Sequence, residues 1–400
     1  MKRIIFSIAC ACAVSAFAQD SKTTAPKASG SPMIKTESDA QAAREYWTPE
    51  RLAAARPMPL PEVDPSSIEA TAHPTVSGPA RHQAGGLPTI RLAPSTELRE
   101  ERFPLNTGDS EDGSDDHVVA ESDTFFNYEM PFQNYRTGIN NSYPYTTLGK
   151  LFFTIPAGAS EPAGDYVCSA SVAMDKHTVV TARHCMFDIS TGKWYGNWQF
   201  YPGWNNGSDA TLGGEWTVNF AYTWTSNGGN STWYWDIGFL SMHDHDGKGC
   251  GGSTGTAQIG AYTGWLGYWY GGWDGNYVQR QWNIFGYPQA SPFEGNYLYQ
   301  DNGATGQLDP EGATGIVEVG NPQTGGTSGG PWILGFDPYG GANPTVNNNL
   351  TPAGDYNMIN GLNSFKWTTP NHPLSINGAE FNSDNFRQLY TNYTNYGHCS

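Results

Sequence analysis

From about residue 121 onward, short apolar runs alternate with clusters of Gly, Asn, Asp and Pro. Runs of this length between turn residues are typical of β-strands. The predicted strands are residues 148–155, 166–174, 178–181, 198–201, 216–224, 237–242, 281–287, 315–319, 331–336 and 358–367. Many short strands at such spacing predict an all-β fold, built as barrels or as a sandwich.

One helix is predicted near the C-terminus. Ser383 is a suitable N-cap, and Asp384 complements the positive end of a helix. The apolar face is formed, at helical spacing, by Phe386, Leu389, Tyr390 and Tyr393.

Composition strengthens the all-β prediction and narrows the partners. The chain has 48 Gly, 22 Tyr, 18 Phe and 14 Trp among its 400 residues, and 15% of its residues are charged. This mixture is rich in turn and strand formers and poor in helix formers. The 38 Asp and Glu exceed the 21 Lys and Arg, which gives a formal net charge of -17 at pH 7. A surface this acidic repels nucleic acids and anionic membranes, so neither is an expected partner.

The N-terminus has the pattern of an export signal. Lys2 and Arg3 precede an apolar run, residues 4–14, which is followed by the small-x-small sequence of residues 16–18. This order is typical of a secretory signal peptide, residues 1–18. Because the apolar run is too short to cross a bilayer, we expect no membrane anchor and a protein secreted to the periplasm or the medium.

Export also decides the expected state of the cysteines. Two of the six leave with the signal peptide, and four remain for an oxidising compartment: Cys168, Cys185, Cys250 and Cys399. Four cysteines allow three pairings.

Residues 19–120 differ in composition from the rest of the chain. Residues 1–120 hold 12 of the 27 Pro but only 6 of the 48 Gly and one of the 14 Trp. The stretch lacks the apolar content of an independent core, and one short helix is predicted at residues 49–55. It is either a disordered linker or a largely irregular propeptide. We expect a propeptide that is removed after export, followed by a single domain at residues 121–400.

The sharpest chemical motif is TARHC, residues 181–185, in which an apolar strand runs into His184 and Cys185. Cys168 lies on the preceding predicted strand. A disulfide between Cys168 and Cys185 would fix the backbone beside the imidazole, and closing a loop of this size stabilises a fold by about 3 kcal/mol.

Two further motifs give His184 a chemical context. Asp236 opens an apolar strand in WDIGFL, residues 235–240, and Ser328 lies among glycines in GGTSGGP, residues 325–331. Glycines let the backbone fold tightly around a Ser, leave its Oγ uncrowded and let N–H groups point into a pocket. The order His, Asp, Ser predicts a catalytic triad.

With these motifs the chain resembles the chymotrypsin-like (trypsin-type) serine proteases, and among them the bacterial glutamyl endopeptidase branch. The branch features are YPYTTLGKLFFT, residues 143–154, and FGYP, residues 285–288. The resemblance covers about residues 140–396. It implies two antiparallel six-stranded β-barrels with the site in the cleft between them, and a C-terminal helix.

The resemblance also implies a reaction and its residues. Ser328 is expected to attack the scissile carbonyl of a protein or peptide substrate, with His184 as the base and then the acid, and Asp236 as the group that holds the imidazole. The backbone N–H groups of Gly326 and Ser328 are expected to form the oxyanion hole. No cofactor or metal is implied. The remaining Cys250 and Cys399 are expected to pair with each other.

The chain departs from the trypsin pattern around the nucleophile. Thr327 stands where trypsin-type enzymes have an Asp that accepts the new N-terminal ammonium, so removal of a propeptide must unblock the cleft or act through another N-terminal contact. Pro322, next to Gln323, stands where trypsin has its pocket Asp, which does not support a preference for Lys or Arg. The expected pocket is lined by Pro322, Gln323, Asn363, Ser364 and Lys366.

The pocket residues leave the cleavage preference open. Asn363 stands where glutamate-specific relatives have a His, which weakens the case for glutamate. Lys366 either attracts an acidic side chain or is a solvated strand Lys.

Two other features have alternative interpretations. Residues 243–246, His-Asp-His-Asp, form a metal site or, as we expect, a polar loop. The aromatic run of residues 265–273 is either a carbohydrate-stacking platform or, as we expect, core packing. The alternative to a protease is therefore a catalytically silent binding protein with an aromatic binding surface. An esterase is disfavoured because its G-x-S-x-G motif and triad order differ from those of this chain.

Overall fold

The computed structural model describes residues 28–64, 81–90, 133–137, 142–208, 210–227, 232–245, 257–271, 281–305, 307–308, 315–338, 356–368, 374–379 and 381–396. The expected signal peptide, Cys250 and Cys399 lie outside these residues. No helix in the described ranges is long and apolar enough to span a bilayer.

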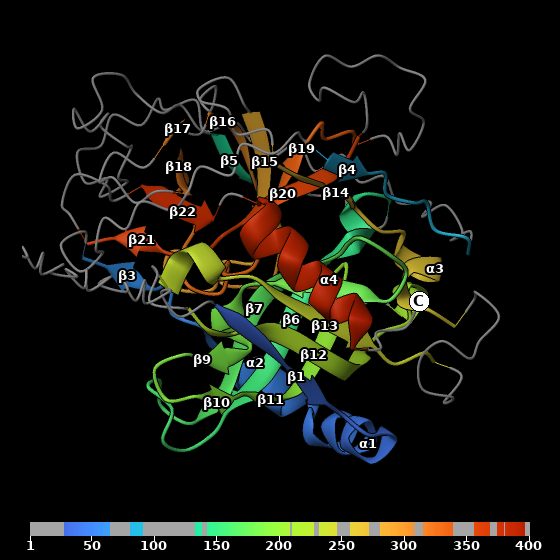
Figure 1. Ribbon diagram of the computed structural model, residues 1–400. Helices are drawn as coiled ribbons and strands as arrows, with labels where there is room; N and C mark the ends of the chain where they lie inside the picture. Colours follow the sequence, from blue (N-terminus) through green and yellow to red (C-terminus); the bar gives the residue numbers. More distant parts are fainter. Residues whose placement is uncertain are drawn as a thin grey trace, which may run out of the picture.

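A closed six-stranded antiparallel barrel forms the first half of the fold (Figure 1). Each strand pairs with two neighbours, and the ring closes where the last strand meets the first. In ring order the strands are β6 (Leu148–Ile155), β7 (Gly164–Val172), β8 (Thr178–Thr181), β13 (Gly238–Met242), β12 (Trp216–Ser226) and β11 (Gly196–Pro202). All six were predicted within a few residues, because their apolar runs are bounded by turn residues.

The second half is built from a seven-stranded and a three-stranded sheet. The larger sheet has the order β4 (Arg81–Gln83), β14 (Gly267–Tyr270), β20 (Met358–Leu362), β19 (Pro331–Leu334), β15 (Gln281–Gly286), β16 (Tyr299–Thr305) and β5 (Gln133–Arg136). The smaller one has the order β17 (Gln307–Leu308), β18 (Ile316–Gly320) and β22 (Ser375–Ala379). All pairings within these two sheets are antiparallel except that of β14 with β20. Three buried tryptophans, Trp269, Trp282 and Trp332, dominate the core between the sheets.

The C-terminal helix joins the two halves. A helical turn, η7 (Ser383–Arg387), leads into α4 (Gln388–Asn395) (Figure 1). Tyr393 packs against Phe220 and Phe239 of the first barrel, and Phe386 packs against Tyr268 of β14. The predicted apolar face is confirmed. The N-cap is Asn382 rather than Ser383, because the Asn382 side chain accepts the N–H groups of Asp384 and Asn385.

The stretch expected to be largely irregular contains regular structure in its described part. Its elements are β1 (Ser29–Ile34), α1 (Glu37–Tyr46), α2 (Pro49–Ala54), β2 (Arg56–Pro57), β3 (Glu62–Val63) and β4. The prediction at residues 49–55 is confirmed by α2, whose N-cap is Thr48. A capping box between Thr36 and Asp39 starts α1. These elements lie on the surface of the barrels: β1 extends the first sheet beside β12, and β4 extends the larger sheet of the second half.

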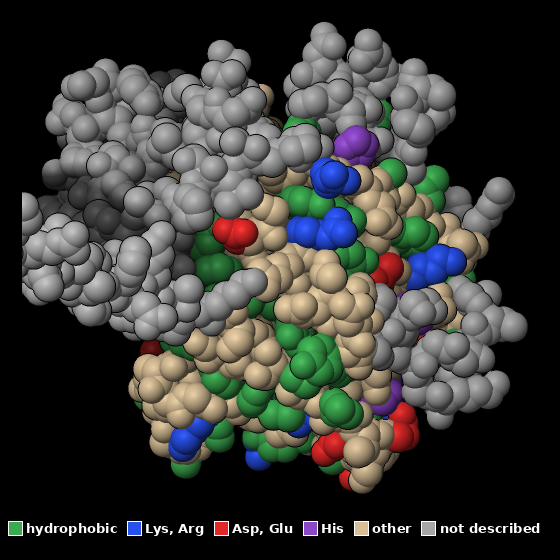
Figure 2. Space-filling view, viewed as in Figure 1, with side chains coloured by type: hydrophobic (Ala, Val, Ile, Leu, Met, Phe, Trp, Pro, Cys, Tyr) green, Lys and Arg blue, Asp and Glu red, His purple; other side chains and the backbone are tan. Residues whose placement is uncertain are grey.

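Short elements complete the described chain. They are η2 (Tyr145–Thr147), η3 (Arg183–Cys185), β9 (Phe187–Asp188), β10 (Lys193–Trp194), η4 (Ala210–Leu212), η5 (Thr232–Trp235), α3 (Ile259–Thr263) and β21 (Lys366–Trp367). Charged side chains are sparse on the described part of the face in Figure 2, in keeping with the low charged content of the chain.

Candidate active site

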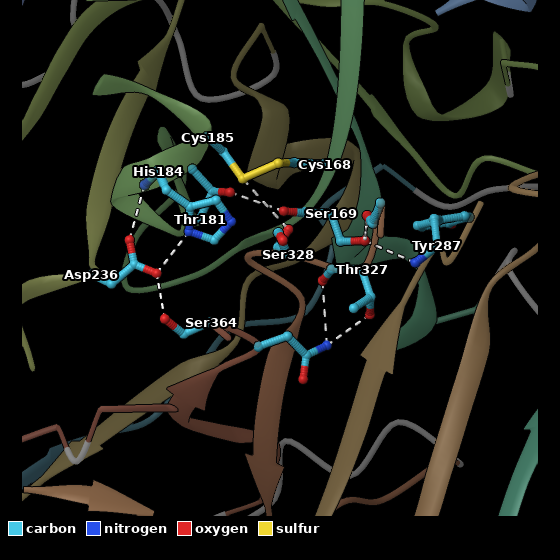
Figure 3. Close-up of a disulfide and its surroundings, with 12 residues drawn as sticks. Cys168, Ser169, Thr181, His184, Cys185, Asp236, Tyr287, Thr327, Ser328 and Ser364 are labelled. Atoms are coloured by element: carbon cyan, nitrogen blue, oxygen red, sulfur yellow. Dashed lines mark hydrogen bonds and ion pairs between the residues drawn. A yellow bond between two sulfur atoms is a disulfide. The ribbon is translucent and has the colours of Figure 1, made fainter. Parts of the chain in front are cut away.

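A disulfide between Cys168 and Cys185 joins β7 to η3, the turn that carries His184 (Figure 3). The sulfur atoms and an imidazole nitrogen of His184 lie within 4.8 Å of one another. Both sulfurs are bonded to each other, so neither is a thiolate ligand, and the group is not a metal centre. The predicted disulfide is present and lies directly beside the imidazole.

His184 and Asp236 make two hydrogen bonds. The backbone N–H of His184 donates to Asp236 Oδ1 at 2.9 Å, and His184 Nδ1 lies 2.8 Å from Asp236 Oδ2 (Figure 3). Asp236 is 2% exposed, at the end of η5 and just before β13. The carboxylate therefore fixes both the backbone and the ring of His184.

The charge state of Asp236 is set by its surroundings. Burial opposes its ionisation, but His184 and the buried guanidinium of Arg183 outweigh burial and hold the pKa of Asp236 below its ordinary value. The hydroxyl of Ser364 also donates to Asp236 Oδ2, at 2.5 Å. Asp236 is thus an anion at neutral pH and can accept a hydrogen bond from a proton-bearing Nδ1 of His184.

Ser328 lies in a tight turn before β19 that is held against β7. The Ser328 carbonyl accepts the N–H of Ser169 at 2.8 Å, and Ser169 Oγ donates to the Gly326 carbonyl at 2.9 Å. Gly329 has φ +78, and a Cβ there would lie 2.1 Å from Thr181 Oγ1. The predicted need for glycine is thus met by a positive φ and by close packing of this turn on the first barrel.

Ser328 and His184 approach the same disulfide. Cys185 Sγ lies 3.8 Å from the Ser328 carbonyl oxygen, and Figure 3 shows Ser328 next to the His184 ring. Among the residues that the structure describes, neither Ser328 Oγ nor His184 Nε2 has a hydrogen-bond partner. These are the two atoms that a triad would bring together, and such bonds are often long before substrate binds.

The N–H of Gly326 points at a carbonyl oxygen. It donates to the carbonyl of Met58 at 2.9 Å, while the Gly325 carbonyl accepts the N–H groups of Gln289 and Ala290. Gly326 has φ +95, a conformation that favours glycine. The N–H that is expected to serve as an oxyanion donor is therefore already bonded to Met58, which belongs to another segment of the same chain.

Thr327 and Asn363 form a buried polar network next to Ser328. Asn363 Nδ2 donates to Thr327 Oγ1 at 2.9 Å, Thr327 Oγ1 donates to Gln323 Oε1, and Trp332 Nε1 donates to Asn363 Oδ1 at 2.8 Å. Thr327, Gln323 and Asn363 are fully buried. The network supports the Ser328 turn, and the amide of Asn363 is bonded within it to protein groups.

The other expected pocket residues have different environments. Ser364 faces Asp236, and Pro322 is half-buried. Lys366 is half-buried on β21, and burial lowers its pKa to about 8, with Glu62 acting in the opposite direction. Of the five residues, Ser364 thus contacts Asp236, whereas Gln323 and Asn363 belong to the network around Thr327.

In the candidate metal site, the described residues 243–245 do not point their side chains toward one common point. His243 lies 3.4 Å from Glu37 and Asp244 lies 3.4 Å from His177, whereas His245 stacks on Trp216 with ring centroids 3.6 Å apart. The side chains of residues 243–245 thus have three separate sets of partners.

The aromatic run packs into the core in its described part. Tyr268, Trp269 and Tyr270 are at most 7% exposed, and Tyr268 and Tyr270 lie against the C-terminal helix. Buried rings cannot stack on a carbohydrate, so these three residues form no binding platform.

Three site residues have no counterpart among the predictions. Ser169 links the Ser328 turn to β7 by hydrogen bonds, and Arg183 lies buried near Asp236. The carbonyl of Met58 accepts the N–H of Gly326. Arg183 stands inside the TARHC motif, where a charged residue directly before the His is itself a signal. Serines such as Ser169 are too common on strands to be noticed. Met58 lies in a proline-alternating sequence, PMPLP, which is typical of an extended segment.

No protein-family model and no curated protein matches the chain. Among solved structures, it is similar to the protease Anisep from Arthrobacter nicotinovorans, with 25% sequence identity and a TM-score of 0.48, over 65% of this chain and 98% of that one. It is also similar to the thermostable serine protease AL20 from an extremophilic microorganism, with 25% identity and a TM-score of 0.46, over 63% and 98% of the two chains. A third is a Glu endopeptidase in complex with MPD, with 14% identity and a TM-score of 0.42, over 66% and 97%. All three of these proteins are proteases by name.

Proposed function

We propose that the chain is a secreted serine endopeptidase, made as a precursor, that hydrolyses peptide bonds through Ser328, His184 and Asp236. The proposal depends mainly on the contacts of His184. The Asp236 carboxylate is hydrogen-bonded to both the backbone N–H and Nδ1 of His184, and Ser328 and His184 both lie next to the Cys168–Cys185 disulfide. A buried carboxylate, an oriented imidazole and a hydroxyl on a glycine turn are the parts that nucleophilic acyl transfer requires.

Each group has a role at a stated atom. His184 Nε2 takes the proton of Ser328 Oγ as the oxygen attacks the scissile carbonyl, and later gives it to the leaving amine. Asp236 holds the imidazole and stabilises its positive charge. Water then attacks the acyl-enzyme by the same route, and the acid product leaves.

The negative charge of the tetrahedral intermediate needs donors that are already oriented. The N–H groups of Gly326 and Ser328 are the proposed donors. In support, the Gly326 N–H donates to the Met58 carbonyl oxygen at 2.9 Å, within the range for donors in an oxyanion hole. Losing one such donor costs about a hundredfold to a thousandfold in rate.

Export and precursor status complete the proposal. The signal-like residues 1–18 and the Cys168–Cys185 disulfide support an oxidising compartment. Residues 19–120 are proposed as a propeptide ahead of the protease domain at 121–400. N-terminal sequencing of the protein isolated after export tests both boundaries.

The test of the activity is fluorophosphonate labelling of the processed protein, with casein cleavage followed in parallel. The variant is Ser328→Ala, and the matched control is Ser208→Ala, which removes a hydroxyl from an exposed loop. We expect Ser328→Ala to lose labelling and proteolysis together and Ser208→Ala to keep both. A processed wild type that is neither labelled nor active would contradict the proposal and favour a binding protein.

A further inference from the structure

Residues 55–64 cross the candidate active site as one extended segment, here called the strap. Met58 sits at its centre: its N–H donates to the Val167 carbonyl of β7, and its carbonyl accepts the Gly326 N–H, both at 2.9 Å. Further along, the Lys366 N–H donates to the Pro61 carbonyl at 2.8 Å. The strap therefore binds the backbone of both halves of the fold, with its middle on the proposed oxyanion hole.

Three apolar side chains of the strap point into the protein. Met58 is 4% exposed and joins the core that contains the Cys168–Cys185 disulfide. Leu60 packs on the core of the second half, and Val63, 6% exposed, packs in a cluster with Phe365 and Trp367. Arg56, before these residues, and Pro59 and Glu62, between them, are exposed. This alternation is that of a peptide seated in a groove rather than of a loop lying on a surface.

The sequence prepares the strap for this conformation. Prolines at 57, 59 and 61 fix φ at values found in extended chains, so little conformational entropy is lost on docking. A Gln side chain clamps the segment at its start: Gln289 Nε2 donates to the Ala55 carbonyl at 2.7 Å, and Lys150 Nζ donates to Gln289 Oε1 at 2.9 Å. Lys150 is itself 4% exposed, so this clamp is built into the protein interior.

The direction of the strap makes it unlike a substrate. β2 pairs in parallel with β7, and β3 pairs in parallel with β21. In a substrate, the nitrogen that follows the attacked carbonyl must lie beside His184, because His184 gives it a proton when it leaves. His184 lies next to the Cys168–Cys185 disulfide, and therefore on the side of β7. The strap runs the other way. Its residues beside β7 come before Met58, and after Met58 the chain continues through Pro59 to β21. The nitrogen that follows the Met58 carbonyl is therefore on the side away from β7.

We propose that the strap is a built-in inhibitor that binds the active site in the non-productive direction and places the Met58 carbonyl in the oxyanion hole. This inference rests on the proposed function, because inhibition requires an active Ser328. The site it assigns is a groove for an extended, apolar, proline-alternating peptide. Activation then consists of the departure of the strap, with no need for an Asp at the position of Thr327.

The test compares the rate of Ser328 phosphonylation in full-length precursors that intact mass shows to be uncleaved. The strap variant is Met58→Asp with Val63→Asp, which puts charges at two buried positions. The matched control is Ala53→Asp with Ala54→Asp, which adds the same charges at exposed positions of α2. Because reactivity follows the fraction of molecules with an open strap, we expect the strap variant to react at least about tenfold faster than wild type, and the control to match wild type.

A second measurement needs no folded variant. A synthetic peptide of residues 55–64 is added to processed wild type, and phosphonylation and peptide integrity are followed together. We expect the peptide to slow labelling and to remain uncut, and the same peptide with Asp at positions 58 and 63 to have no effect.

The outcomes separate the two proposals. If processed protein is labelled but the strap variant reacts no faster than wild type and the peptide does not slow labelling, the inhibitor proposal alone is overturned. Cleavage of the peptide after Met58 would overturn the non-productive direction. If processed protein is not labelled at all, the proposed function falls, and the inhibitory role falls with it.

Discussion

Ser364 and Asp236 are joined by a hydrogen bond in which the Ser364 hydroxyl donates to Oδ2, the same oxygen that faces Nδ1 of His184. The bond is fully buried, so water cannot replace the donor. Ser364 therefore helps to keep Asp236 ionised without itself touching a substrate.

The first prediction concerns this donor. Ser364→Ala removes one group that holds the pKa of Asp236 below its ordinary value, so the pKa rises and the carboxylate is lost at a higher pH. We expect kcat/KM to fall about tenfold and the acidic limb of its pH profile to move upward. The pH profile of a peptide ester checks this, with Ser208→Ala as control. An unchanged acidic limb would show that Ser364 has only a packing role.

Arg183 gives the second prediction, because its buried positive charge acts on the same carboxylate. Burial lowers the pKa of Arg183 to about 10, so it remains a cation at neutral pH. Arg183→Met should move the acidic limb of kcat/KM upward, whereas Arg183→Lys, which keeps the charge, should move it less. Equal shifts in both variants would assign Arg183 to structure through its bond to Asn227 instead.

The third prediction concerns the disulfide. Removing it by Cys168→Ala with Cys185→Ala frees a loop whose ends are 17 residues apart, and we expect the free energy of unfolding to fall by about 3 kcal/mol. Urea denaturation of the precursor measures this change. The rate of Ser328 phosphonylation should fall as well, because His184 loses a neighbour that holds it. A stable variant with a normal labelling rate would contradict the positioning role of the disulfide.

The fourth prediction concerns Asp188, which stabilises a loop away from the site. Burial opposes its ionisation, but hydrogen bonds from Ser190, Thr191 and Ser160 hold its pKa well below the ordinary value. A depressed carboxylate pKa contributes stability above the unfolded value, about pH 4, and this contribution is lost as pH falls through the folded value.

Asp188→Asn should therefore lower the free energy of unfolding at pH 7 by about 2 kcal/mol. The difference from wild type should shrink as the pH is lowered below about 4. Urea denaturation at several pH values measures both effects. Glu294→Gln, at an exposed position, is the control and should be neutral. A difference that does not depend on pH would contradict the role of the charge.

The sequence predicted the first barrel and the approach of His184, Asp236 and Cys185 well, because each of these residues lies shortly before or after an apolar strand bounded by turn residues. A residue next to a strand is positioned by the pairing of that strand, so the sequence pattern of the strand is enough to predict where the residue lies. The bounds of β6 and β8 were correct to the residue.

The N-terminal stretch was harder to predict for a physical reason. Its few apolar residues, such as Met58 and Val63, are buried against the barrels and form no core of their own. The composition of this stretch therefore resembles that of a disordered chain, although its described part is held in place by contacts with the rest of the fold. Asn363 illustrates a second limit: the sequence offered it only as a pocket residue, because its contacts depend on Thr327 and Trp332, which are distant in sequence.

The proposed function requires Ser328 to be the nucleophile of a protease. Peptide mapping of processed wild type after fluorophosphonate treatment tests it most directly. We expect one adduct, on Ser328, that is absent when His184 is replaced by Ala. An adduct on another residue, or none on a correctly processed and folded protein, would show that Ser328 is not the nucleophile.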